Sequence, residues 1–139
     1  MERRDFLEKL GIGAAFVLTS SCLGACSKTD YAPTGTIDFT VDLAAAANSA
    51  LAANGGYIID TANKVVVARD TAGNYVAATQ VCSHEGNVQV IYNKTANSYQ
   101  CTAHGATFDL LGKGTNSNGS KGLTIYKTTL TGTKLRVYS

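Results

Sequence analysis

The sequence predicts an all-β protein, an antiparallel β-sandwich or barrel, and three observations support this class. Short runs of alternating apolar and polar residues recur along the chain, separated by turn residues. The composition is typical of a β-rich domain, with many Gly, Thr, Val and Tyr residues, one proline and no tryptophan. Within the expected domain, a single alanine-rich stretch favours a helix.

The first part of the domain contains that helix and three predicted strands. Residues 36–41 alternate apolar and polar with period two, which is typical of a half-buried strand. Residues 43–54 are rich in alanine and favour a short helix, and the following pair of glycines supplies the permissive backbone that ends it. Two further strands are expected at residues 57–60 and 64–69.

The second part of the domain continues with short strands separated by turns. They are expected at residues 75–79, 88–92, 98–101, 123–129 and 134–138. The second and third of these form a hairpin, which folds back so that its two ends meet. Residues 112–122, rich in Gly, Ser and Asn, are expected to form a flexible loop.

The N-terminus has the pattern of an export signal. Arg3 and Arg4 precede Phe6 and Leu7, and an apolar run follows at residues 10–18. That run is too short to span a bilayer, which takes about 20 residues, but it suits the core of a signal peptide. The paired arginines resemble the twin-arginine signal, whose route exports folded proteins. An amphipathic anchoring helix is the alternative interpretation.

The apolar run is followed by a cysteine that is a candidate for lipidation. The stretch Leu23-Gly24-Ala25-Cys26 resembles the bacterial lipobox, in which the cysteine becomes the new N-terminus and receives acyl chains. Cys22 is a weaker candidate, because no aliphatic residue lies three positions before it. A disulfide between Cys22 and Cys26 is a further alternative. Lipidation at Cys26 predicts a lipoprotein of the bacterial cell envelope that faces the periplasm.

These segments set the expected organisation of the 139-residue chain. We expect a signal peptide at residues 1–25, a tether at residues 26–35 and one domain at residues 36–139. The formal net charge of +2 gives no indication of a nucleic-acid partner. No glycine-rich motif follows a predicted strand in the way that a nucleotide or flavin site requires.

Two cysteines and the two histidines of the chain form one motif. Cys82 and His84 are followed, after sixteen intervening residues, by Cys101 and His104. Two thiolates and two imidazoles select iron–sulfur, zinc or copper over hard cations. One tetrahedral zinc ion is therefore an alternative, although zinc fingers commonly pair cysteine with cysteine and histidine with histidine. Four buried residues without a metal are a third interpretation.

The spacing resembles the Rieske [2Fe–2S] family, which has Cys-x-His-x-Gly, about sixteen residues, then Cys-x-x-His-Gly-x-x-Phe/Tyr. The matching residues here are Cys82, His84, Gly86, Cys101, His104, Gly105 and Phe108. The resemblance implies a [2Fe–2S] cluster, with both cysteines on one iron and both histidines on the other. It also implies a Rieske-like antiparallel β-sandwich, with a small inserted cluster-binding subdomain at about residues 81–112.

Several positions depart from the high-potential members of that family. Ala106 and Phe108 stand where those proteins have Ser and Tyr hydroxyls that hydrogen-bond to sulfur. Asn87 and Ala103 lie near the places of a family disulfide, and the segment Gly119-Ser120-Lys121 has no proline where many members have a Gly-Pro-Ala loop. We therefore expect a low to intermediate potential. Glu85 is interpreted as a solvated loop charge.

The resemblance implies a one-electron carrier that exchanges electrons with unidentified donor and acceptor proteins. The alternative is a small electron-transfer subunit, or a ferredoxin-like partner, of a larger oxidoreductase. A zinc-stabilised binding module is the third hypothesis. A Rieske oxygenase needs a further iron held by two histidines and a carboxylate, and both histidines of this chain are already assigned. We therefore expect an electron-transfer component without catalytic activity of its own.

Overall fold

The computed structural model describes residue 33 and residues 35–139, and the expected export signal and Cys26 lie outside these described residues. Nine strands and one short 3₁₀ helix (η1) form the described part. In chain order they are β1 (Asp38–Asp42), η1 (Ala46–Ala52), β2 (Tyr57–Asp60), β3 (Val65–Arg69), β4 (Tyr75–Thr79), β5 (Val90–Asn93), β6 (Ser98–Cys101), β7 (Thr107–Phe108), β8 (Ile125–Thr131) and β9 (Lys134–Tyr138).

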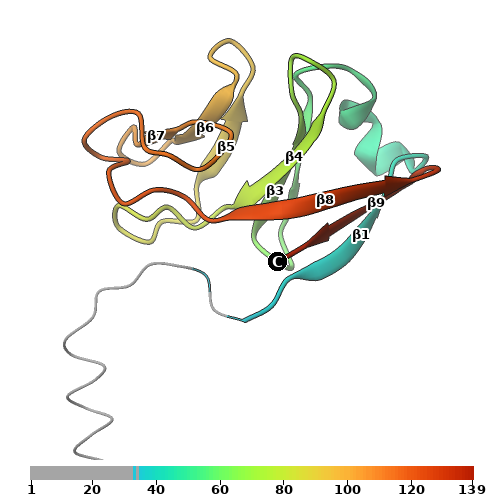
Figure 1. Cartoon of the computed structure of the whole chain (residues 1–139), viewed down its shortest axis with the longest axis horizontal. Helices are drawn as coiled ribbons and strands as arrows, with labels where there is room; N and C mark the ends of the chain where they lie inside the picture. Colours follow the sequence, from blue (N-terminus) through green and yellow to red (C-terminus); the bar gives the residue numbers. More distant parts are fainter. Residues whose placement is uncertain (1–32, 34) are drawn as a thin grey trace, which may run out of the picture. The chain divides into compact units, whose positions relative to one another are not determined.

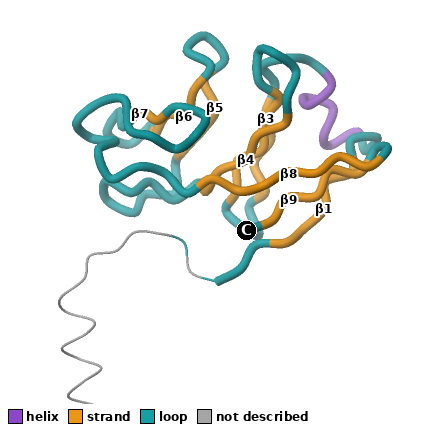
Figure 2. Tube along the Cα trace, in the orientation of Figure 1, coloured by secondary structure: helices purple, strands orange, loops and turns teal. Residues whose placement is uncertain are grey.

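The strands form two antiparallel sheets, which confirms the predicted all-β class. The larger sheet has six strands in the order β1-β9-β8-β4-β3-β2, and the smaller has three in the order β5-β6-β7. In Figure 1 the three-stranded sheet lies at one end of the described domain, and η1 lies at the other. Long loops surround β5, β6 and β7, whereas longer strands dominate the six-stranded sheet (Figure 2).

Strand β3, which lies between β4 and the edge strand β2, contributes side chains to two separate cores. Successive side chains of a strand point to opposite faces, and Val65, Val66, Val67 and Ala68 are all fully buried. Val65 and Val67 pack in one cluster with Val41, Leu51, Ala77, Tyr126, Leu135 and Val137. Val66 and Ala68 pack in the other, with residues of the three-stranded sheet and its loops. That second core joins the two sheets.

The alanine-rich stretch forms a shorter and tighter helix than predicted. It is a 3₁₀ helix over Ala46–Ala52, without a side-chain cap at Ala45. The Asn48 amide donates instead to the Asp42 carbonyl at 2.8 Å, and Leu51 is the residue of the helix that is buried. In the described residues, no helix is long and apolar enough to cross a membrane.

Candidate metal centre

The first ligand loop, residues 80–89, connects β4 to β5. An isolated bridge between Val81 and Val88 closes its base, and the N–H of Cys82 donates to the carbonyl of Asn87 at 2.8 Å. The N–H of Gly86 donates to the carbonyl of Cys82, also at 2.8 Å. Gly86 has a φ of 74°, which glycine adopts without steric cost. The segment between Cys82 and Gly86 is therefore a closed turn that contains His84.

The second ligand loop, residues 101–106, connects β6 to β7 and is built in the same way. The N–H of Cys101 donates to the carbonyl of Ala106 at 2.8 Å, and the N–H of Gly105 donates to the carbonyl of Cys101 at 3.0 Å. Gly105 also has a φ of 74°. In each loop, a left-handed glycine four residues after the cysteine turns the chain back toward it. This requirement explains both glycines of the motif.

The β5–β6 hairpin brings the two loops together, as the sequence predicted. Val90 pairs with Cys101 across the hairpin, and the N–H of Thr102 donates to the carbonyl of Gln89 at 3.2 Å. The second loop thus begins beside the end of the first. The sixteen residues between His84 and Cys101 are the length needed to leave the first loop, complete the hairpin and return.

The two cysteines form the buried half of the centre. Cys82 and Cys101 have relative exposures of 1% and 0%, and neither is in a disulfide. Burial raises the pKa of the Cys82 thiol, the backbone N–H of His84 lowers it, and a side-chain hydrogen bond with Cys101 raises it again. Thiols in such surroundings lose their protons when a metal cation binds, because the metal stabilises the thiolate.

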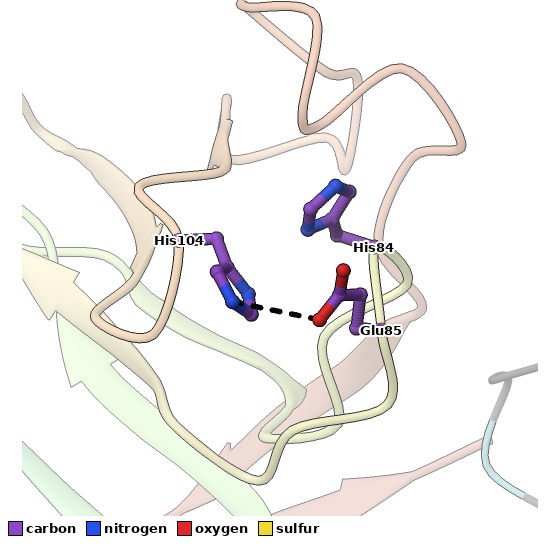
Figure 3. Close-up of side chains that lie close together, drawn as sticks. All are labelled: His84, Glu85 and His104. Carbon is purple, nitrogen blue, oxygen red and sulfur yellow. Dashed lines mark ion pairs between the residues drawn. The ribbon is translucent and has the colours of Figure 1, made fainter.

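The two histidines form the more accessible half. Their ring centroids are 5.2 Å apart, with the planes inclined by 72°. His84 comes from the first ligand loop and His104 from the second, and Glu85 lies beside them (Figure 3). The Nε2 atom of His104 is 3.4 Å from Oε2 of Glu85, and the two side chains are 43% and 54% exposed. Glu85 is thus solvated, as expected, but it also has a partner that the sequence did not indicate.

Two polar atoms of the first ligand loop are buried without a hydrogen-bond partner among the described residues. They are Oγ of Ser83 and Nδ1 of His84. Buried polar atoms are almost always paired, so an unpaired one needs a partner outside the protein chain. An imidazole nitrogen is a metal ligand, and a hydroxyl can donate to sulfur. Both atoms therefore fit a bound metal–sulfur group.

The donor atoms are grouped in a way that suits two metal atoms better than one. In the described part of the chain, donor atoms of His84, Glu85 and His104 all lie within 4.8 Å of one another, and this group contains neither cysteine. One tetrahedral zinc ion, with bonds of about 2.0–2.3 Å, would instead bring all four donors within roughly 4 Å of each other. A pair of thiols beside a pair of imidazoles suits a two-iron group better.

The residues at the two positions that the family resemblance links to the redox potential lie inside the core. Ala106 and Phe108 are both fully buried, and neither side chain has a hydroxyl to donate. Sequence reasoning missed Ser83 as a buried donor, and it missed the asparagines of the loop after β7 that contact the second ligand loop. Ser83 could have been noticed from its place between two motif residues. The asparagines carry no such signal, because their contacts depend on the tertiary fold.

Comparisons with known proteins bear on the family and the fold. The family model described as the Rieske [2Fe-2S] domain matches residues 43–127. No curated protein is similar enough in sequence to match the chain. The crystal structure of the cyanobacterial plasma membrane Rieske protein PetC3 from Synechocystis PCC 6803 aligns with a TM-score of 0.50 and 26% identity, covering 60% of this chain and 85% of that one.

Two more distant structures share the fold. The ferredoxin of carbazole 1,9a-dioxygenase from Nocardioides aromaticivorans IC177 aligns with a TM-score of 0.51 and 22% identity, covering 61% of this chain and 86% of that one. The quaternary ammonium Rieske monooxygenase CntA aligns with a TM-score of 0.51 and 19% identity. That alignment covers 75% of this chain but 31% of the monooxygenase.

Proposed function

Because the chain belongs to the Rieske [2Fe–2S] domain family, we propose that it passes single electrons between redox proteins through a cluster held by Cys82, Cys101, His84 and His104. When bound, the [2Fe–2S] cluster supplies one-electron oxidation and reduction. The observation that carries this ligand assignment is the separation of a buried thiol pair from a more exposed imidazole pair.

The cysteine pair and the histidine pair would have different roles in binding the cluster. Cys82 and Cys101, which are fully buried, would hold one iron away from water. His84 and His104 would hold the second iron, and the unpaired Nδ1 of His84 is the natural ligand atom on that residue. The side chain of His104 is 43% exposed, so its outer edge is the part of the site that a redox partner reaches. Electrons would enter and leave at this edge.

The surroundings support a low to intermediate potential. Hydrogen bonds to the cluster sulfurs stabilise the reduced, more negative state and raise the potential. The side chains of Ala106 and Phe108 provide no such bond, while the carboxylate of Glu85 beside His104 disfavours an added electron. A hydrogen bond from the Ser83 hydroxyl to a cluster sulfur would act in the opposite direction. We place the potential in the lower part of the family's range of about −150 to +300 mV.

The chain supplies too few histidines to be an oxygenase by itself, because a mononuclear iron in addition to the cluster would need two more. A role as the small electron-transfer subunit or ferredoxin-like partner of a larger oxidoreductase is the second candidate. This role is supported by the fold that the chain shares with the ferredoxin of carbazole 1,9a-dioxygenase. Co-purification of a larger redox protein with the tagged chain would favour this second candidate over a free carrier.

We also propose that the protein is exported and anchored in the cell envelope through lipid on Cys26. The support is the twin-arginine and lipobox pattern of the N-terminus. Similarity to a cyanobacterial plasma membrane Rieske protein is compatible with this location. Metabolic labelling with a radioactive fatty acid tests the proposal, since labelling should disappear in Cys26→Ser and persist in Cys22→Ser. Equal labelling of wild type and Cys26→Ser would refute it.

Metal analysis of anaerobically purified protein tests the ligand assignment. We expect two iron atoms and two inorganic sulfides per chain, lost in Cys82→Ser and Cys101→Ser. Cys26→Ser is the matched control, because it removes a thiol that we assign to lipidation and should retain the full cluster. One zinc ion per chain in place of iron and sulfide would overturn the assignment.

A further inference from the structure

The loop after β7 is held closed by its own hydrogen bonds. We call residues 112–122 the asparagine loop. The N–H of Gly119 donates to the Asn116 carbonyl at 3.2 Å and to Asn116 Oδ1 at 3.0 Å. Where the loop closes, the N–H of Leu123 donates to the Gly112 carbonyl at 2.8 Å. A Cβ at Gly114 would clash with the Gly119 carbonyl oxygen, so the two sides of the loop touch.

The asparagine loop is also attached to β7. The N–H of Thr115 donates to the Thr107 carbonyl at 2.9 Å, and the N–H of Thr107 donates to Asn116 Oδ1 at 3.1 Å. An isolated bridge joins Phe108 to Gly114. The loop that the sequence predicts to be flexible therefore has a defined position against the strand that follows the second ligand loop.

Two side-chain amides extend from this position to the second ligand loop. Nδ2 of Asn118 donates to the carbonyl of His104 at 2.8 Å. Nδ2 of Asn116 donates to the carbonyl of Gly105 at 2.7 Å. The two acceptors are consecutive, and one of them belongs to a proposed iron ligand. The backbone of His104 is thus held by a segment outside its own loop.

We propose that Asn118 and Asn116 are positioning residues, which fix the backbone of His104 and Gly105 so that the His104 imidazole stays oriented toward the cluster. This inference rests on the proposed function. Oδ1 of Asn116 also accepts two hydrogen bonds, one from Gly119 that closes the asparagine loop and one from Thr107 that attaches it to β7, whereas its amide nitrogen and that of Asn118 donate to the second ligand loop. A substitution can therefore remove the amide donor of either asparagine and leave the acceptor oxygen of Asn116 in place.

Asn118→Asp is the sharpest variant, because it keeps the size of the side chain and replaces the donor with a second carboxylate oxygen against the His104 carbonyl. Asn116→Asp keeps the acceptor for Thr107 and Gly119, removes the donor to Gly105 and adds a negative charge. The loss of one hydrogen bond costs about 1 kcal/mol. If this cost lowers the barrier to opening of the metal site, the rate of iron release rises about fivefold. We expect about fivefold faster iron release to a chelator in each variant.

The matched control is Asn48→Ala, which removes an amide hydrogen bond of the same length, 2.8 Å, to the Asp42 carbonyl beside η1. Iron release, the g-values of the reduced cluster and the melting temperature are measured for all variants under anaerobic conditions. We expect faster release and shifted g-values in Asn118→Asp and Asn116→Asp. Asn48→Ala should keep wild-type release and g-values even where its melting temperature falls.

Two outcomes would overturn the inference. Wild-type iron release and g-values in both aspartate variants would show that the amides do not position the ligand. Changes of equal size in Asn48→Ala would show a general loss of stability instead. Asn118→Ala replaces Asn118→Asp if the carboxylate prevents folding. A wild-type protein without iron and sulfide would refute the proposed function itself, which separates that failure from a failure of this inference.

Discussion

Replacing Glu85 by glutamine removes one negative charge from beside a proposed iron ligand while keeping the shape of the side chain. Oε2 of Glu85 is 3.4 Å from Nε2 of His104. A carboxylate at this place disfavours the addition of an electron to the site. The Glu85→Gln protein should therefore have a higher midpoint potential than the wild type.

The exposure of the two side chains sets the size of this effect. They are 43% and 54% exposed, so solvent screens the charge and a dielectric constant close to that of water applies. At this separation the interaction is then about 1 kcal/mol, which corresponds to roughly 40 mV for a one-electron couple. This is an upper limit, because the added electron resides on iron, farther away than the imidazole edge.

Spectroelectrochemical titration at pH 7 measures the shift. We expect a rise of about 20–40 mV at low ionic strength, and a smaller rise in 0.5 M salt because mobile ions screen exposed charges. Asp42→Asn is the control, since it also removes a carboxylate from an exposed ion pair, with Lys134 at 2.8 Å. An unchanged or lower potential in Glu85→Gln, or an equal rise in Asp42→Asn, would refute the reasoning.

Three further predictions address other parts of the domain. Ser83→Ala removes a buried hydroxyl that has no hydrogen-bond partner among the described residues. The midpoint potential of the cluster should fall if that hydroxyl donates to a cluster sulfur. A redox titration that finds no change would place the acceptor of the hydroxyl elsewhere. Phe108→Ala should lower the free energy of unfolding, measured in urea, by about 3–5 kcal/mol because the ring is fully buried. The control Leu111→Ala, at a side chain that is 88% exposed, should lower the free energy of unfolding by less than about 0.5 kcal/mol. Hydrogen bonds from Arg136 lower the pKa of Asp38, so this carboxylate stabilises the fold above its unfolded pKa of about 4 and loses that contribution as pH falls through the folded pKa. Asp38→Asn should therefore lower the melting temperature at pH 7 but not at pH 2. An equal decrease at both pH values would contradict a stabilising ion pair.

The strands were predictable because they depend on local pattern. The hairpin of β5 and β6 was predicted from two short runs around a polar turn, with the first strand expected at residues 88–92 and observed at Val90–Asn93. Buried and partly buried residues alternate along both strands. The helix was predicted less well. Alanine propensity favours helical backbone over residues 43–54, but in so short a stretch it does not offset the free-energy cost of helix nucleation. The structure retains a 3₁₀ segment over Ala46–Ala52 that relies on tertiary contacts.

The candidate site was predictable to the extent that its residues are close in sequence to the motif. The spacing of the cysteines and histidines, together with the family resemblance, indicated the two ligand loops, and the structure adds that Gly86 and Gly105 close each turn at a fixed distance from its cysteine. The contacts of Asn116 and Asn118 could not be foreseen, since they join residues 11 and 14 positions apart through a loop whose path depends on β7. The partner of Glu85 was missed for the same reason.

The most direct test of the account is pulsed EPR on the reduced protein, with the histidines labelled with ¹⁵N. The account predicts a low average g-value, as expected for a histidine-ligated two-iron cluster, and hyperfine coupling to two histidine nitrogens, one each from His84 and His104. One coupling should disappear in His84→Cys and the other in His104→Cys. A reduced cluster without any coupled histidine nitrogen, or a protein that contains zinc and gives no EPR signal, would contradict it.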